Sequence, residues 1–320
     1  MADSRLALAK AWVSQQQATQ VFTIQPLAGD ASFRRYFRVF TPETTYVLMD
    51  APPEKEDVSP FVQVCDWLAK NKLNVPKIVV RDQSQGFLLL EDFGDVTWAV
   101  YFNDNNDLTA LFKDALQQLH TLQSLEATIN LPCFDVNRMQ RECDLYLDWY
   151  LPHIKGEKPT QEERDQFQAA LLPLLQEINV LPQAPVHLDY HSRNLMLPQS
   201  GLPLGVIDFQ DAVIGPITYD LASLLYDCYQ DYPEEERREW SKHFFAGLSQ
   251  EHQSHFTNFA AWHRAVRLTS LQRHIKVLGI FARLAYRDGK MQFLDEIPLT
   301  HKHCMEELKA LSLQIPMLTA

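Results

Sequence analysis

Two segments of this 320-residue chain, HLDYHSRN at residues 187–194 and VIDF at residues 206–209, are the most informative about its fold. The two segments place an aspartate at position 189, an asparagine five positions later and a second aspartate at position 208. An Asp-x4-Asn pair alone is common by chance, and Asp208 alone would be an ordinary carboxylate at a strand exit. Here both segments occur in this order, at a short separation, and an apolar run leads into each of them. The combination is therefore a motif whose meaning depends on its structural context.

This set of side chains matches what phosphoryl transfer from ATP requires. One carboxylate must accept the proton of the attacking hydroxyl, and oxygen ligands must hold the Mg²⁺ ions that bridge the phosphates. We therefore predict Asp189 as the general base, with Asn194 and Asp208 as the metal ligands. His187 is expected to hold the loop by hydrogen bonds rather than to titrate. Asp220 is expected to cap the helix that follows and to brace the loop.

The spacing resembles that of the catalytic loop and metal-binding aspartate in the protein-kinase-like fold. A segment that begins His-Leu-Asp rather than His-Arg-Asp resembles the aminoglycoside/choline phosphotransferase branch of that fold. The resemblance implies an α+β, two-lobe architecture, in which a small and mostly antiparallel β lobe with one helix precedes a large, mainly α-helical lobe. A protein kinase is not expected, because no Ala-Pro-Glu segment follows Asp208.

The hydrophobic pattern predicts the same order of elements. The apolar residues Phe61, Val64, Cys65 and Leu68 fall at i, i+3, i+4 and i+7, which is the pattern of a helix with one buried face. Before residue 92 we expect helices at 3–18 and 57–70 and strands at 21–26, 34–40, 46–49, 77–81 and 87–90. Beyond it the pattern is helical, with apolar stripes at 108–119 and 139–150 and helices at 219–248 and 255–287.

The two lobes are expected to meet at a hinge near residues 89–95. This divides the chain into a nucleotide-binding lobe at 1–94 and a catalytic and substrate-binding lobe at 95–320. Backbone amides and carbonyls at such a hinge suit the edge of an adenine ring, which makes Leu90 and Glu91 candidate nucleotide contacts. The alternative is an ordinary buried strand that ends in a turn, and this alternative would have the same structure as the hinge.

A candidate phosphate-covering loop lies between two of the predicted strands. It consists of Gly29, Asp30, Ala31 and Ser32, small residues that let backbone N–H groups approach a phosphate. A hairpin with one glycine is ordinary, so the prediction depends on the position of the loop and on the arginines that follow it.

The third strand departs from the wider kinase pattern. It lacks the lysine that would reach the α- and β-phosphates, and no Lys or Arg occurs between Arg38 and Lys55. The helix at 57–70 also lacks the partner glutamate. We expect Arg35 or Arg38 to supply the missing charge from the neighbouring strand. The alternative is a nucleotide binder that has lost catalysis.

The last long helix concentrates cations within an acidic protein. Arg267 and His274 lie seven positions apart and hence on one face, which makes them candidate substrate ligands. A solvated helix face is the alternative. Asp211, just after the metal aspartate, either binds a substrate hydroxyl or closes a turn.

At finer grain the chain resembles the bacterial anomeric kinases of N-acetylmuramate and N-acetylglucosamine that serve cell-wall recycling. The resemblance rests on the blocks GDASFRRYFR at 29–38, MDAPPEKE at 49–56, LLEDFGD at 89–95, IDFQDA at 207–212 and QRHIKVLG at 272–279. It implies ATP and Mg²⁺ as cofactors, Asp189 as the base for the C1 hydroxyl and a sugar 1-phosphate as product. The missing strand lysine fits this subgroup.

Charge bears on the substrate. N-acetylmuramate carries a lactyl carboxylate, which suits a pocket with arginine, whereas aminoglycosides are polycations and favour carboxylates. The cationic helix favours the acidic sugar, whereas the net charge of −12 favours a cationic substrate such as an aminoglycoside. Two alternatives stay open: an aminoglycoside- or choline-type phosphotransferase, and a non-catalytic nucleotide-binding module.

Composition limits the remaining partners. The net charge of −12 argues against nucleic acid and anionic membrane surfaces, so a small-molecule sugar is the expected partner. Five scattered cysteines without a Cys-x-x-Cys pair argue against a zinc site or disulfides and favour the cytoplasm. No signal peptide and no apolar run long enough to span a bilayer is evident. The sequence does not indicate an oligomeric state.

Overall fold

The computed structural model describes residues 3–16, 21–27, 33–104, 107–197 and 203–318. Its contacts divide the chain into two compact units, which are described here one at a time. The first unit contains residues 1–96 and 196–211, and the second contains residues 97–195 and 212–320. A domain boundary at residue 94 stays a prediction.

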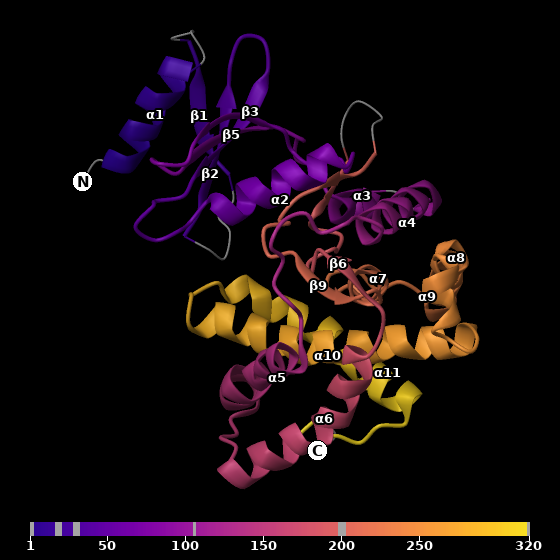
Figure 1. The fold of residues 1–320 in the computed structure, drawn as a ribbon. Coiled ribbons are helices and arrows are strands. Elements are labelled where there is room, and N and C mark those ends of the chain that lie inside the picture. Colours follow the sequence, from indigo (N-terminus) through magenta and orange to yellow (C-terminus); the bar gives the residue numbers. More distant parts are fainter. Residues whose placement is uncertain (1–2, 17–20, 28–32, 105–106, 198–202, 319–320) are drawn as a thin grey trace. The chain divides into compact units, whose positions relative to one another are not determined.

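The first unit is built on a five-stranded sheet in which all neighbouring strands are antiparallel (Figure 1). The order across the sheet is β1-β2-β3-β5-β4. The strands are β1 Thr23–Pro26, β2 Arg35–Phe40, β3 Thr45–Asp50, β4 Ile78–Asp82 and β5 Phe87–Glu91. All five predicted strands are therefore present, because their β-branched and aromatic residues pack on a pleated, half-buried surface.

Two helices accompany this sheet. Helix α1 (Ser4–Gln16) buries Trp12, whose ring lies 5.5 Å from that of Phe87 on β5. Helix α2 (Ser59–Lys70) buries the predicted apolar stripe and has a proline in its first turn, where the missing N–H costs no hydrogen bond. The ring of Phe61 on α2 lies 4.9 Å from that of Phe209, which belongs to the segment that returns to this unit.

The second unit is mainly helical. Its elements before the catalytic stretch are α3 Trp98–Asp104, α4 Thr109–Gln123, α5 Val136–Leu145, the π-helix η1 Tyr146–Lys155, α6 Gln161–Asn179 and β6 Gln183–Val186. After it come β9 Val213–Pro216, α7 Tyr219–Leu225, α8 Glu234–Gly247, α9 Gln250–Ser254, α10 Phe259–Tyr286, the 3₁₀-helix η2 Met291–Glu296 and α11 Ile297–Leu311. Strands β6 and β9 pair antiparallel. Two short strands, β7 (Leu195–Met196) and β8 (Gly205–Val206), form a separate two-stranded sheet. Strand β8 lies within residues 196–211, which belong to the first unit.

Helix α10 is the centre of this unit and packs against α5, η1, α7 and α11 (Figure 1). One glycine decides how closely α5 and η1 approach it. A Cβ atom at Gly279 would lie 2.3 Å from the backbone carbonyl carbon of Leu145, where α5 ends and η1 begins. The backbones therefore meet at a crossing that only glycine allows.

Several predicted elements differ from the observed ones. The stripe at 139–150 is not one α-helix, because α5 ends at Leu145 and the chain continues as η1, which contains Pro152. The helices predicted through 219–248 are α7 and α8, with residues 226–233 between them. Helices α3, α6 and α11 were not predicted, although α6 begins with a complete capping box between Thr160 and Glu163.

The five cysteines are all free, and they differ in exposure. Cys133 is exposed, whereas the other four are buried. Burial raises the pKa of the Cys65 thiol and of the Cys304 thiol to about 12 in each case. Within the part of the chain that the structure describes, no helix has the length and apolar character needed to cross a membrane.

Candidate active site

The loop after β6 folds back on its own backbone at Asp189. The carbonyl oxygen of Asp189 accepts hydrogen bonds from the His191 amide at 3.0 Å and from the side-chain amide of Asn194, also at 3.0 Å. The backbone amide of Asn194 donates to the His191 carbonyl at 2.9 Å. The predicted base and one predicted metal ligand are thus brought together by the turn itself.

A buried carboxylate holds the beginning of this loop. Asp220 is fully buried and accepts hydrogen bonds from the backbone amides of His187 at 2.7 Å and Leu188 at 3.0 Å. It orients Leu188, whose φ of +77° lies in the left-handed region. This conformation is unfavourable for a residue with a branched side chain. His187 in turn accepts, through Nδ1, a hydrogen bond from the Asp189 amide at 3.2 Å.

The prediction that Asp220 caps its helix is wrong. Helix α7 has Thr218 at the N-cap position without a side-chain cap, and Asp220 lies inside the first turn. Its carboxylate is used by the loop instead of by its own helix, because it is directed at two amides that have no other acceptor in secondary structure.

A second buried aspartate, which the sequence analysis missed, holds the middle of the loop. Asp227 accepts hydrogen bonds from the amides of Ser192 and Tyr229, each at 2.8 Å. The Ser192 carbonyl accepts from the Ala99 amide at 3.1 Å, and the Tyr190 hydroxyl donates to a carbonyl of α4. The loop is therefore fixed from several sides before any ligand binds.

Two buried cations on α10 act on the Asp189 carboxyl. Burial alone raises the pKa of this group, but the charge of Lys276, together with smaller effects of His191, Arg273 and His187, holds the pKa below its usual value. The ammonium group of Lys276 lies 3.3 Å from the Tyr219 hydroxyl oxygen and 3.3 Å from a carboxylate oxygen of Glu142. Asp189 is therefore ionised at neutral pH, as an acceptor of a hydroxyl proton has to be.

Asp208 belongs to the first unit, where local contacts orient it. Its φ is +66°, and its Oδ1 atom accepts a hydrogen bond from the Gln210 side chain at 2.8 Å. Phe209 anchors the segment against α2, as described above. Asp211 follows in an exposed turn, which fits either of the two roles left open for it.

The two arginines proposed as phosphate ligands already have carboxylate partners. Arg35 pairs with Asp50, the fully buried last residue of β3. This is the strand on which the wider kinase pattern has a lysine. Arg38 pairs with Asp92 at 2.7 Å and with Asp95 at 2.7 Å. A phosphate role for either arginine stays a prediction. Gly29, Asp30, Ala31 and Ser32 lie outside the described residues.

The predicted hinge follows β5. Leu90 is buried opposite Val47 of β3, and the backbone amide of Glu91 donates to the Lys77 carbonyl at 2.9 Å. The Asp92 carboxylate accepts a hydrogen bond from the amide of Gly94, whose φ is +83°. Arg38 thus ties β2 to the end of β5, so the chain leaves the sheet in a defined direction.

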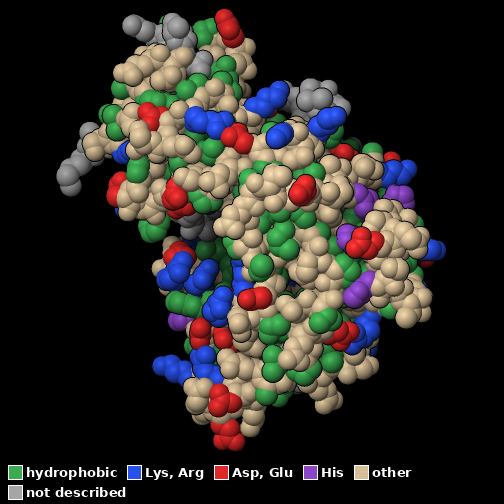
Figure 2. All heavy atoms as spheres, viewed as in Figure 1, with side chains coloured by type: hydrophobic (Ala, Val, Ile, Leu, Met, Phe, Trp, Pro, Cys, Tyr) green, Lys and Arg blue, Asp and Glu red, His purple; other side chains and the backbone are tan. Residues whose placement is uncertain are grey.

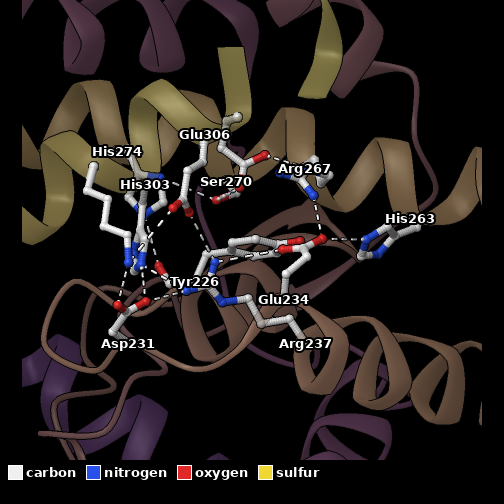
Figure 3. Close-up of polar contacts among 12 residues, drawn as sticks. Tyr226, Asp231, Glu234, Arg237, His263, Arg267, Ser270, His274, His303 and Glu306 are labelled. Atoms are coloured by element: carbon white, nitrogen blue, oxygen red, sulfur yellow. Dashed lines mark hydrogen bonds and ion pairs between the residues drawn. The ribbon is translucent and has the colours of Figure 1, made fainter. Parts of the chain in front are cut away.

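Arg267 and His274 lie in a cluster of polar residues between α8, α10 and α11 (Figure 3). Arg267 donates to the buried Glu307 at 3.0 Å and pairs with Glu234. His274 is fully buried, and its Nε2 atom lies 2.9 Å from the Tyr226 carbonyl oxygen. Burial holds the pKa of His274 well below its usual value, so the ring is neutral. A substrate role for either residue stays a prediction.

The donor atoms are compatible with magnesium. Asn194 donates through its amide nitrogen to the loop and carries an amide oxygen of the kind that magnesium accepts, and Gln210 donates to the Asp208 carboxylate. Among the residues that the structure describes, no group of three or more His, Cys, Asp or Glu is arranged to hold a metal.

Comparison with known proteins settles the family. A model of the phosphotransferase enzyme family matches residues 23–263. The chain belongs to this family. It is 39% identical over 272 residues to the N-acetylmuramate/N-acetylglucosamine kinase of Pseudomonas putida, covering 85% of this chain and 79% of that protein. It is 38% identical to the kinase of the same name from Neisseria meningitidis, covering 90% and 86% of the two chains.

Solved structures confirm the predicted fold class. An ADP-bound aminoglycoside phosphotransferase matches with a TM-score of 0.63 at 18% identity, covering 94% of this chain and 98% of that one. A choline/ethanolamine kinase family protein from Mesorhizobium loti matches with a TM-score of 0.66 at 14% identity, covering 96% and 97%. With its five-stranded sheet and mainly helical second unit, this chain has the kinase-like architecture expected from the sequence.

Proposed function

We propose that this phosphotransferase uses ATP and magnesium to phosphorylate the C1 hydroxyl of N-acetylmuramate, N-acetylglucosamine or both. The observation that carries the proposal is the ionised Asp189 carboxylate on a loop held by Asp220 and Asp227. The names of the relatives at 38–39% identity support the choice of sugar. The cytoplasm, where such sugars would meet ATP, is the proposed place of action.

In the reaction, the C1 hydroxyl of the sugar donates a hydrogen bond to the Asp189 carboxylate, which orients the oxygen toward the γ-phosphorus. The new bond joins that oxygen to phosphorus, and the bond between the γ-phosphorus and the oxygen of the leaving ADP breaks. The proton passes to Asp189 late in the step, because a sugar hydroxyl is a weak acid. The rigid loop supplies positioning, which is the larger part of catalysis in this chemistry.

Asn194 and Asp208 are the proposed magnesium ligands. The metal, when bound with ATP, would neutralise charge on the phosphate oxygens. Leu90 and Glu91 are proposed to contact the adenine through their backbone, and Gly29 to Ser32 to cover the phosphates. This assignment requires no lysine on β3, the strand that ends at the buried Asp50.

An aminoglycoside- or choline-type acceptor is the second candidate, because solved structures of both kinds share the fold. Their identities of 18% and 14% lie well below those of the sugar kinases, which is why the sugar is proposed first.

The test measures ADP release with magnesium against N-acetylmuramate, N-acetylglucosamine, choline and kanamycin, and locates the phosphate by phosphorus NMR. A sugar 1-phosphate formed by the wild type, and reduced about 10²- to 10⁴-fold in Asp189→Asn, is the expected result. Turnover of choline or kanamycin alone would refute the substrate. Tight ATP binding without turnover of any acceptor would favour a non-catalytic module.

A further inference from the structure

A second cationic surface of α10 borders a pocket that has no assigned role. Arg273, Lys276 and Arg283 occupy positions i, i+3 and i+10, which lie on one face of the helix. The first two act on Asp189, and the third lines a pocket of about 540 Å³ between α5 and α10. On the molecular surface, Lys and Arg side chains gather over α5 and the C-terminal end of α10 (Figure 2). The cationic face thus extends from the catalytic loop into the pocket.

Three arginines line this pocket, which we call the arginine pocket: Arg138 and Arg141 from α5 and Arg283 from α10. Two carboxylates also line it, and both have partners. Asp135 caps α5 by accepting from the Arg138 amide at 2.8 Å. Glu142 pairs with Arg138 at 3.2 Å and with Lys276.

The other two arginines lack such partners. Among the residues placed by the structure, no carboxylate lies within ion-pair distance of Arg141 or Arg283, and the buried Nε of Arg283 makes no hydrogen bond. Burial and the nearby charge of Arg287 lower the pKa of Arg283, and the charge of Asp288 offsets only part of that effect. A half-buried guanidinium group without an ion-pair partner is costly, and an anion bound between these arginines would relieve that cost.

The pocket beside Arg267 offers a contrast. That pocket has a volume of about 330 Å³ and contains the cations Arg237, Arg267 and Lys302. They pair with three carboxylates in its wall: Asp231, Glu234 and Glu306. An incoming anion would have to displace these internal partners. In the arginine pocket it would not, and the volume there falls within the ~300–1,000 Å³ typical of small-ligand sites.

Two further features connect the arginine pocket to the reaction. Lys276, whose charge acts on Asp189, bonds Glu142 in the pocket wall. The crossing at Gly279 holds α5 and α10 in backbone contact beside the arginines. A ligand in this pocket is therefore placed by the same helices that set the charge of the catalytic base.

We propose that the arginine pocket binds the carboxylate of an acidic amino sugar through Arg141 and Arg283, while the hydroxyl to be phosphorylated is presented to Asp189. This inference rests on the proposed function and adds what distinguishes the acidic acceptor from the neutral one. A guanidinium group suits a carboxylate because its N–H donors match the two carboxylate oxygens.

The test compares steady-state kinetics of Arg141→Gln and Arg283→Gln with those of the wild type, using N-acetylmuramate and N-acetylglucosamine. The expected result is a KM for N-acetylmuramate raised about 10- to 100-fold, because each variant loses a charge-assisted hydrogen bond. The kcat, the KM for N-acetylglucosamine and the KM for ATP should stay within about twofold. Arg264→Gln, the same substitution at an exposed site near the other end of α10, is the matched control.

Equal effects on both sugars, or no effect on either, would overturn the proposal, and so would a raised KM for ATP, which would point to phosphate binding. Arg141 is exposed, so its variant decides the matter even if Arg283→Gln does not fold. A wild type inactive on both sugars would refute the proposed function instead. Titration of N-acetylmuramate into wild type and Arg141→Gln without ATP would then still test whether the arginine pocket binds the acidic sugar. Binding lost only in the variant supports the proposal, and equal or absent binding overturns it.

Discussion

Replacing Asp220 with asparagine separates the stability of the fold from the geometry of the catalytic loop. The wild-type carboxylate accepts two backbone hydrogen bonds, from His187 and Leu188, and it is fully buried. The asparagine oxygen can accept only one of them, and its amide group would face the other N–H. The start of the loop, with Leu188 in the left-handed region, then loses half of its support.

Two opposing terms determine the effect on stability. A lost hydrogen bond to a charged group costs about 1.5–3 kcal/mol. Burial, however, raises the pKa of Asp220 to about 6 from 3.8, so the ionised carboxylate is disfavoured at neutral pH by about 3 kcal/mol. The variant removes that penalty. We expect the free energy of unfolding at neutral pH to change by less than about 2 kcal/mol.

The pH dependence follows from the direction of the same pKa shift. Because the pKa of Asp220 is higher in the folded state, the folded protein binds more protons than the unfolded chain between about pH 4 and 6. The stability that this group contributes is present below that window and is lost as pH rises through it. The difference between wild type and Asp220→Asn should therefore change by up to about 3 kcal/mol across the window.

The assay combines urea unfolding at several pH values between about 4 and 7 with steady-state kinetics at neutral pH. We expect kcat to fall about 10- to 100-fold, because a displacement of the base by about 1 Å has a cost of that order. Asp165→Asn, at an exposed position of α6 that forms no ion pair among the described residues, is the control. An unchanged kcat, or a wild type and variant with parallel pH profiles of stability, would refute the reasoning.

Three further substitutions test other parts of the structure. Lys276→Met removes a positive charge beside Asp189, so the pKa of that carboxyl should rise and the acid limb of the kcat/KM profile should move to higher pH; an unmoved limb would contradict the electrostatic argument. Gly279→Ala places a Cβ against the backbone of Leu145 and should lower the free energy of unfolding by about 1–3 kcal/mol in urea titrations, whereas an unchanged midpoint would show that the helices can separate freely. Arg38→Met removes the main partner of the Asp92 carboxyl. Burial raises the pKa of this carboxyl, but the hydrogen bond from Arg38 holds it below its usual value. The stability difference from wild type should be largest at neutral pH and should shrink as pH falls below about 4, where a pH-independent difference would argue against the ion pair.

The sequence contained enough to predict the sheet and the catalytic loop. Strands such as β2 and β3 follow from local alternation, and Asp189 and Asn194 meet because a short turn links them. Helix α2 follows from its own apolar stripe. These features depend on neighbours along the chain, which a single sequence records.

What could not be predicted depends on distant contacts. Asp227 is an isolated acidic residue after a helix, and its bonds to the loop exist only because α7 packs beneath that loop. The partners of Arg267 come from α8 and α11, so its helix alone could not show that it is paired. The close crossing at Gly279 likewise needs the position of α5.

The different exposure of the five thiols has a practical consequence for labelling. Because Cys133 alone is exposed, a maleimide dye should attach at one position without removal of the other four cysteines. Cys133 also lines the arginine pocket. A fluorophore there would report by its emission whether a sugar enters, and protection of this thiol from alkylation would give the same information without any mutation.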